Sequence, residues 1–202
     1  MDASVFQLGT AIERSDIDTL DILITELRQV RNSLFDSNPE SSNQSVVNGS
    51  YANSPPQLPR MCVYKDCIPR VLRHRASALL GIEFGESPCY MVMTALQLSV
   101  LIQYTSMSAD EEKRAKVVEM LVKESSVEDI NGNFIGDRCN VLHLAAFLNL
   151  KPTMQLLINH GGDPSIENGF GLNADDIMQA VPTLGLQTME VMEPKARDER
   201  EW

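Results

Sequence analysis

CNVLHLAAFLNLKPTMQLLINHGGDP, residues 139–164, predicts two short antiparallel helices. Leu142, Ala145 and Ala146 share one face of the first helix, and the alanines leave room for a neighbouring helix to come close. After a proline, the apolar run MQLLI starts the second helix, and Gly161 ends it because glycine readily adopts the left-handed conformation that closes a helix. A hairpin this thin cannot bury both of its faces, so we expect the rest of the chain to supply similar units on either side.

The order of these residues resembles an ankyrin repeat. Residues 140–146, NVLHLAA, are similar to the family pattern T-P-L-H-L-A-A, and the later runs MQLLI and NHGGD are similar to V-V-x-L-L-L and G-A-D. The resemblance implies an all-α fold, an ankyrin-type solenoid of stacked helix-turn-helix pairs with long insertions. It also implies that the His143 imidazole hydrogen-bonds to the backbone of the adjoining finger loop. Structural roles follow for Leu142, His143, Ala145, Ala146 and Gly161.

The composition limits the class of protein. A chain of 202 residues with 43% hydrophobic content can bury one or two cores, so it is not disordered throughout. The net charge of -11 argues against binding nucleic acid, because an acidic surface repels phosphates, but it leaves basic or mixed-charge protein partners open. There is no run of about 18 apolar residues, and residues 1–15 lack the apolar core of a signal peptide, so we expect no membrane association. The four cysteines, without a secretory context, suit the cytoplasm or the nucleus.

Residues 1–35 repeat the opening pattern in a weaker form. Leu8, Ala11 and Ile12 fall where the leucine and the two alanines fall in the opening stretch, and the apolar run that follows predicts a second helix longer than usual. We interpret this segment as a degenerate first repeat. A repeat at the end of a stack faces water on one side, so its outer face should be polar. The charged residues that fit this role are Glu13, Arg14, Asp18, Asp21 and Glu26.

Residues 36–60 are rich in serine, asparagine and proline and have almost no apolar periodicity. Such a segment cannot repay the entropy of ordering, so we predict a disordered loop. Two functions are open for it. A plain linker is the simpler one, and the other is a regulatory loop in which serines such as Ser54, which precedes a proline, are phosphorylated.

Residues 61–90 contain apolar side chains at helical spacing, from Ile68 to Leu80, together with a dense positive cluster. We interpret the segment as a helical insertion, and its spacing leaves open whether it stacks with the repeats. The cluster is either a solvated helix face or a docking site for an acidic partner or a phosphate group. Its members are Arg70, Arg73, His74 and Arg75.

A zinc site is a further possibility in this segment. Cys62, Cys67, His74 and Cys89 supply the thiolate and imidazole ligands that zinc prefers. Their spacing argues against the site, since structural zinc sites usually present two close pairs of ligands. The alternative is that the cysteines are unmodified buried thiols. We therefore predict no metal ion and no cofactor.

Residues 91–181 recover the pattern as two recognisable repeats and a partial third. TALQLSV at residues 94–100 is similar to T-P-L-H-L-A-A, and VVEMLV at residues 117–122 is similar to V-V-x-L-L-L. From Leu96 to Leu142 is 46 residues, whereas from Leu142 to Asp175 is 33, which matches the family's period. The first of these repeats therefore carries an insertion. Residues 182–202 form a C-terminal tail.

The sequence predicts no catalytic site. His74, His143 and His160 do not combine with a serine, cysteine or aspartate at a spacing typical of a catalytic set. The Gly161-Gly162 pair lacks the lysine and the preceding strand of a phosphate-binding loop. We therefore expect a protein that is not an enzyme.

The resemblance implies a protein–protein interaction module, an adaptor or regulatory subunit that binds a protein partner of unknown identity through its concave face and finger loops. We expect a monomer that binds neither nucleic acid nor membrane. An alternative is a regulatory protein controlled by phosphorylation or zinc through residues 36–90. For Phe147 and Leu148, exposure as partner anchors and packing against a neighbouring helix are equal alternatives. The predicted contact residues are Asn131, Asn133, Asp137, Arg138, Phe147, Leu148, Lys151, Glu167 and Asn168.

Overall fold

The structure is a computed structural model that describes residues 3–36, 58–64, 68–84, 90–105, 110–133 and 135–181. The described chain is mostly helical, as predicted, and also contains one two-stranded sheet. Most of the predicted loop, residues 37–57, and the tail, residues 182–202, lie outside the described ranges. The elements in chain order are α1 (Ala3–Arg14), α2 (Ile17–Asp36), β1 (Arg60–Tyr64), α3 (Arg70–Leu80), β2 (Tyr90–Thr94), α4 (Ala95–Thr105), α5 (Glu111–Glu124), α6 (Val127–Asn131), α7 (Val141–Phe147), α8 (Lys151–Asn159) and a last helix over residues 174–181.

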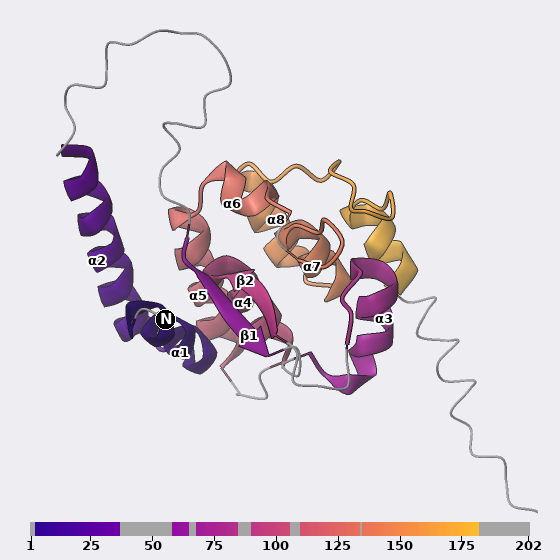
Figure 1. The fold of residues 1–202 in the computed structure, drawn as a ribbon, viewed down its shortest axis with the longest axis horizontal. Coiled ribbons are helices and arrows are strands. Elements are labelled where there is room, and N and C mark those ends of the chain that lie inside the picture. Colours follow the sequence, from indigo (N-terminus) through magenta and orange to yellow (C-terminus); the bar gives the residue numbers. More distant parts are fainter. Residues whose placement is uncertain are drawn as a thin grey trace, which may run out of the picture.

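Within the described chain, consecutive helices pack against one another in three long pairs, and the short helix α6 also packs on α7. The pairs are α1 with α2, α4 with α5, and α7 with α8. α1 packs on α4, which packs on α7, and α2 packs on α5, which packs on α8. Figure 1 shows the result, with α1 and α2 at one end of the molecule and α3 with the last helix at the other. The α4–α5 pair is therefore covered on both sides.

The first helix of each later pair begins with the same exchange of hydrogen bonds. At the start of α4, the Gln97 side chain accepts from the Thr94 N–H at 3.0 Å, and the Thr94 hydroxyl accepts from the Gln97 N–H at 3.2 Å. Asn140 and His143 make the same exchange at the start of α7, and Asn173 makes it at the start of the last helix. Each exchange satisfies N–H groups that a helix start leaves without partners, so it fixes where the helix begins.

Left-handed residues make the turns within and after the helix pairs. Ser15, between α1 and α2, has φ 53°, and Asn149, between α7 and α8, has φ 56°. Asparagine tolerates this conformation better than most residues, so it makes the turn without a glycine. Gly161 has φ 96° and ends α8, and the N–H of Gly162 donates to the Leu157 carbonyl at 2.9 Å. These bonds close the helix in the way that the sequence predicts.

The small residues of the opening stretch lie at a close helix contact. Leu142, Ala145 and Ala146 are fully buried on α7, which packs on α4. An alanine side chain occupies so little space that two helix backbones can approach each other. A charged side chain at either alanine would be buried without a partner, which is costly.

Two short strands are a feature that the sequence patterns do not predict. β1 and β2 pair antiparallel, from Arg60 opposite Thr94 to Tyr64 opposite Tyr90. Each strand has five residues, which is too short for periodicity to distinguish a strand from part of a helix. β2 leads directly into α4, and β1 packs on α1, so the strands connect the first two helix pairs.

α3 is the helix that the spacing from Ile68 to Leu80 predicts. It packs on α7, and two loops hold its C-terminal end. The Asp137 N–H donates to the Leu80 carbonyl at 2.9 Å, and Nδ2 of Asn168 donates to the Leu79 carbonyl at 2.8 Å. α3 therefore belongs to the same packed body as the helix pairs.

Replacing Gly136 with alanine should separate α3 from the first of these loops. Gly136 has φ 50°, and a Cβ added there would lie 1.8 Å from the Leu80 carbonyl oxygen. We expect Gly136→Ala to lower the free energy of unfolding by about 3 kcal/mol, because the backbone must move and the Asp137 hydrogen bond to Leu80 is lost.

Gly171→Ala is the matched control for this substitution. Gly171 has φ 73°, but a Cβ added there meets nothing closer than 4.0 Å. Only the cost of the left-handed conformation remains, about 1 kcal/mol. Chemical denaturation measures both losses, and equal losses would show that the close approach of Gly136 to α3 contributes nothing.

Candidate functional site

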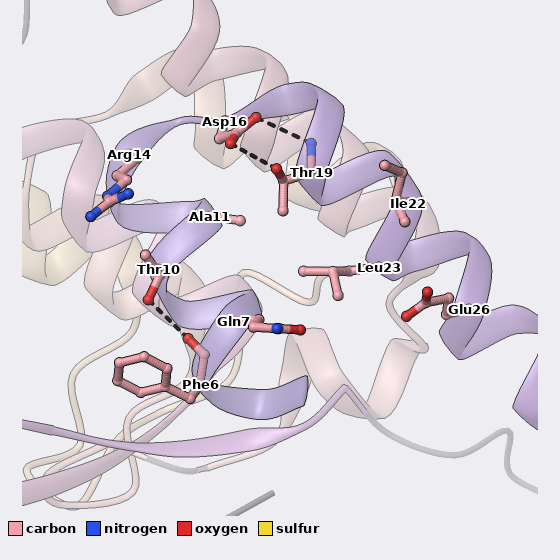
Figure 2. A pocket seen from close by; sticks show the side chains of 10 residues that line it. All are labelled: Phe6, Gln7, Thr10, Ala11, Arg14, Asp16, Thr19, Ile22, Leu23 and Glu26. Carbon is pink, nitrogen blue, oxygen red and sulfur yellow. Dashed lines mark hydrogen bonds between the residues drawn. The ribbon is translucent and has the colours of Figure 1, made fainter. Parts of the chain in front are cut away.

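A groove of about 390 Å³ lies between α1 and α2 (Figure 2). It is lined by these two helices and the turn between them, and by no other part of the described chain. Ala11 and Leu23 are buried and form its floor. Phe6 and Ile22 stand at its margins, with 69% and 60% of their surfaces exposed. A groove with a buried apolar floor and exposed apolar margins is able to hold an apolar ligand surface.

α2 exposes apolar side chains at two kinds of position. Leu27 and Val30 are exposed, although they continue the helical stripe of Leu23, which is buried. Ile22 is also exposed, and it lies on the opposite side of the helix from Leu20, which is buried. The core of the described chain does not account for these exposed side chains, so they favour a contact with something outside it.

The apolar surface continues along α2. A second recess, of about 290 Å³, includes Leu27 and Val30 in its lining and shares Leu23 and Glu26 with the first. The two recesses therefore form one trough. We call this trough, which follows α1 and runs along α2 as far as Val30, the α1–α2 groove.

Charged groups surround the apolar floor of the groove. Asp16 accepts hydrogen bonds from the Thr19 N–H at 3.1 Å and from the Thr19 hydroxyl at 2.7 Å. These bonds lower the pKa of Asp16 and cap α2. Arg14 and Glu26 also line the groove. Asp16 is therefore ionised at neutral pH, and it contributes fixed negative charge at the edge of the apolar surface.

The outer face of the first helix pair differs from the polar face that the sequence predicts. The predicted charged residues are exposed, as expected: Glu13, Arg14, Asp18, Asp21 and Glu26. The face is nevertheless not uniformly polar, because Phe6 and Ile22 lie beside them. The predicted charged residues account for only part of this face, because the helices also turn apolar side chains outward.

A larger concavity, of about 820 Å³, lies where α2, α5 and α8 begin. Most of its charges are paired with one another, since Lys113 is 2.8 Å from Asp110 and Lys116 is 3.3 Å from Glu119. None of the exposed large apolar side chains of the described chain lines it. It therefore offers a partner no large exposed apolar anchor, and four of its five lining charges are paired within it, so the α1–α2 groove is the better candidate.

The positive cluster predicted from the sequence lies on α3 and is partly engaged. Nε of Arg73 donates to the Ile68 carbonyl at 3.2 Å, and the guanidinium lies 5.4 Å from the centre of the Phe84 ring. Arg70 and His74 are exposed, and Arg75 is half-buried. α3 therefore presents a short basic strip.

Five of the predicted contact residues are exposed, and none of them lines the α1–α2 groove: Asn133, Asp137, Arg138, Lys151 and Glu167. Asn131 is half-buried and connects two loops. Its Nδ2 donates to the Gly161 carbonyl at 2.9 Å, and its Oδ1 accepts from the Asp163 N–H at 2.8 Å. Asn131 thus holds the end of α6 against the loop after α8.

The remaining three predicted contact residues are buried, which corrects the prediction for them. Phe147 and Leu148 are 4% and 5% exposed. All residues of α7 are buried, because α3, α4, α6 and α8 pack on it, so the alternative of packing against neighbouring helices holds. Asn168 is 2% exposed, and its side chain bonds to the Leu79 carbonyl and to two N–H groups of its own loop. These three residues support the architecture and cannot contact a partner.

His143 and Cys139 are buried groups of the kinds used in catalysis, and both serve the structure. Nδ1 of His143 accepts from the Asn140 N–H at 3.0 Å, so Nε2 carries the proton and donates to the Ile166 carbonyl at 3.0 Å. The bond from His143 to Ile166 joins the start of α7 to the loop after α8, and a bond of this kind is what the resemblance implies for His143. Burial lowers the pKa of His143 and raises the pKa of Cys139 to about 11. At neutral pH the ring is therefore neutral with both nitrogens occupied, and the thiol keeps its proton.

The regulatory alternatives involve residues that are mostly outside the described ranges. Cys67 and Cys89, two of the four possible zinc ligands, lie outside them, and so does Ser54. Cys62 is exposed on β1, and His74 is exposed on α3. Among the residues that the structure describes, no group of three potential ligands is close enough to hold a metal ion.

Phe147→Ala should lower the free energy of unfolding by about 3 to 5 kcal/mol, because it removes a buried aromatic ring and leaves a cavity. Phe6→Ala is the control, because Phe6 is exposed and its truncation should change stability by less than about 0.5 kcal/mol. Chemical denaturation of both variants measures the difference. If the Phe147→Ala protein were as stable as the Phe6→Ala protein, Phe147 would not be a buried core residue.

The protein should lose stability as the pH falls below about 6.5, in part because of His143. Burial lowers the pKa of His143 in the folded state, so the unfolded chain takes up this proton at a higher pH than the folded protein does. The contribution of His143 to stability is therefore complete above the unfolded pKa and is lost as the pH falls towards the folded pKa. Melting midpoints measured between pH of about 7.5 and 5 test this.

His143→Gln should flatten that pH dependence. A glutamine at this position can accept from the Asn140 N–H, as Gln97 accepts from the Thr94 N–H, but it does not titrate. His74→Gln, at an exposed position, removes an imidazole without touching the core. An equal flattening by both substitutions would show that His143 is not the source of the slope.

No protein-family model matches this sequence, and a search of curated proteins finds no relative. No helix within the described ranges combines the length and the apolar character needed to cross a membrane. The function therefore has to be argued from the chemistry and the geometry of the chain itself.

Proposed function

We propose that this protein is a protein-binding module without catalytic activity, built as a short, irregular array of ankyrin-type helix pairs. The similarity of residues 140–163 to the family's pattern supports the array. So does the packing of first helices on first helices and of second helices on second helices. The same exchange of hydrogen bonds recurs at Thr94, Asn140 and Asn173, and His143 ties the start of α7 to the loop after α8. Arrays of stacked pairs provide rigid surfaces for partner proteins.

The α1–α2 groove is the surface that we propose for the partner. The observation that carries this proposal is the exposure of Phe6 and Ile22 at the margins of a floor formed by Ala11 and Leu23. Large apolar side chains that line a groove are typical binding anchors. Removing one such side chain from water supplies about 2 kcal/mol. The surface centred on Phe147, which the sequence suggests, is buried under other helices.

A role as an adaptor or regulatory subunit in the cytoplasm or nucleus has more support than catalysis. The sequence offers no set of residues at catalytic spacing. His143 has both ring nitrogens hydrogen-bonded, and the Cys139 thiol is buried with a pKa of about 11. Both observations favour binding as the activity of this chain.

Affinity capture from cells, compared between variants of the full chain, tests the proposed function. Ile22→Asp should lower the amount of a defined set of bound proteins by at least about tenfold, because a carboxylate cannot enter an apolar contact. Val71→Asp is the matched control, since Val71 is an exposed valine on α3. Melting midpoints verify that both variants are folded.

Arg138→Glu in the same experiment tests the finger loops that the sequence favours. Arg138 is exposed and lies outside the α1–α2 groove. If only the Arg138→Glu variant lost its bound proteins, the binding surface would lie on the loops and not in the groove. Identical sets of proteins in all variants would contradict the groove as a binding surface.

A further inference from the structure

We propose that the α1–α2 groove binds a basic amphipathic helix of another protein. This inference rests on the proposed function and specifies the chemical class of the partner. It is carried by the shape of the groove, by its apolar floor and by the sign of the charges around it.

The shape of the groove fits a helix. Side chains on two adjacent helices form ridges with a channel between them, and the ridge of a third helix packs into such a channel. The first helix pair already packs on other helices, because α1 contacts α4 and α2 contacts α5. The groove runs along α2 from Asp16 to Val30. A partner helix of about 15 residues, about 22 Å long, can follow this length.

The apolar content of the groove calls for an amphipathic partner. Ala11 and Leu23 form the floor, and Phe6, Ile22 and Leu27 are exposed along it. One stripe of apolar side chains on the partner can cover these residues, while its opposite face stays in water. A helix that is polar on all sides would leave Phe6 and Ile22 facing charged groups.

The charges around the groove favour a basic partner. Residues 3–30 contain five acidic residues and two arginines, and the charged residues that line the groove itself are Asp16, Glu26 and Arg14. Nε of Arg28 donates to Glu124 of α5 at 2.9 Å, so one of the two positive charges is compensated within the molecule. Asp16 is held in its ionised form by its bonds from Thr19, and Glu26 lines both recesses. The net charge of -11 adds a long-range attraction for a basic partner.

A second copy of this chain is a poorer occupant. Two chains that each carry a net charge of -11 repel each other. The helix with the positive cluster, α3, packs on α7 with one side and uses Arg73 to contact Ile68 and Phe84. α3 therefore offers another copy only a short strip around Val71.

Fluorescence anisotropy with designed peptides tests the inference on the full chain. The probe is a labelled helical peptide of about 15 residues with leucines on one face and lysines on the other. One comparison peptide has glutamates in place of the lysines, and another has the lysines and leucines in an order that forms no apolar face. We expect the amphipathic lysine peptide to bind at least about tenfold more tightly than either. Equal binding of the reordered peptide, or tighter binding of the glutamate peptide, would overturn the inference.

Ile22→Asp distinguishes binding in the groove from general attraction of charges. The substitution adds a negative charge, so non-specific attraction of the lysine peptide would increase. Binding in the groove should instead weaken by about tenfold or more, because the apolar anchor is lost. Val71→Asp adds the same charge on α3 and should leave the affinity within about twofold. Unchanged or tighter binding to Ile22→Asp would overturn the inference.

Glu26→Lys tests the electrostatic part separately. It reverses one charge that lines the groove and should weaken the lysine peptide by at least about threefold. Glu111→Lys makes the same reversal at the start of α5, outside the groove, and should have a smaller effect. Equal effects would show that only the total charge of the protein is sensed, which would overturn the inference.

Photoreactive p-benzoylphenylalanine in place of Phe6 identifies the occupant directly. Crosslinking to the lysine peptide supports the inference. A crosslinked dimer of the purified chain would assign the groove to a second copy, and a crosslink to residues 37–57 or 182–202 would assign it to a segment of the same chain. Either result would overturn the inference. Capture of cellular proteins that depends on Ile22, together with failure of the lysine peptide, would retain the proposed function and remove only the partner class.

Discussion

The fold depends on α4 being covered on both sides. A layer of paired helices leaves an apolar face in water unless another pair packs on it. α4 packs on α1 and on α7, and residues 95–102 are buried throughout. Two of them, Gln97 and Ser99, are polar, and each bonds within its own helix start or turn: Gln97 caps α4, and the Ser99 hydroxyl donates to the Leu96 carbonyl at 2.7 Å. These bonds stay within the start of α4, while Oε1 of Gln103, further along the helix, accepts from the Thr153 hydroxyl of α8 at 2.7 Å.

In each of these caps, the side chain three residues after the N-cap residue also determines whether the helix is hydrogen-bonded to the next loop. His143 accepts from its own helix start with one nitrogen and reaches the Ile166 carbonyl with the other. Gln97 makes the same cap, but its Nε2 is buried without a hydrogen-bond partner in the described chain. Asp176 caps the last helix and has no donor with which to reach further. Of these three caps, only the one at α7 also ties its helix to the following loop.

Features that depend on local chemistry can be predicted from this sequence, whereas features that depend on distant segments cannot. The buried face of α7 follows from helical spacing, and the end of α8 follows from Gly161. Phe147 has the same place in the helical pattern whether or not α3 covers α7, so periodicity cannot assign it to the surface or to the core. Asn168 is a clearer case, because its bond to Leu79 joins positions 89 residues apart. No pattern within one helix pair contains that information.

The α1–α2 groove cannot be predicted from the sequence either, because it depends on how separate helices pack. One feature of the sequence nevertheless indicates it. The run Ile22-Leu23-Ile24 looks like one buried stretch, yet successive residues of a helix point about 100° apart, and only Leu23 and Ile24 are buried. An apolar residue that remains once the core stripe is assigned therefore marks a possible contact surface. Within the described chain, α1 packs on α4 and α2 packs on α5, and the first helix pair also exposes Phe6 and Ile22 among its charged residues, where a terminal face would be expected to be polar throughout. α4 is thus covered on both sides, whereas α1 and α2 keep exposed apolar side chains. A helix from a partner would cover these side chains by the same kind of helix packing.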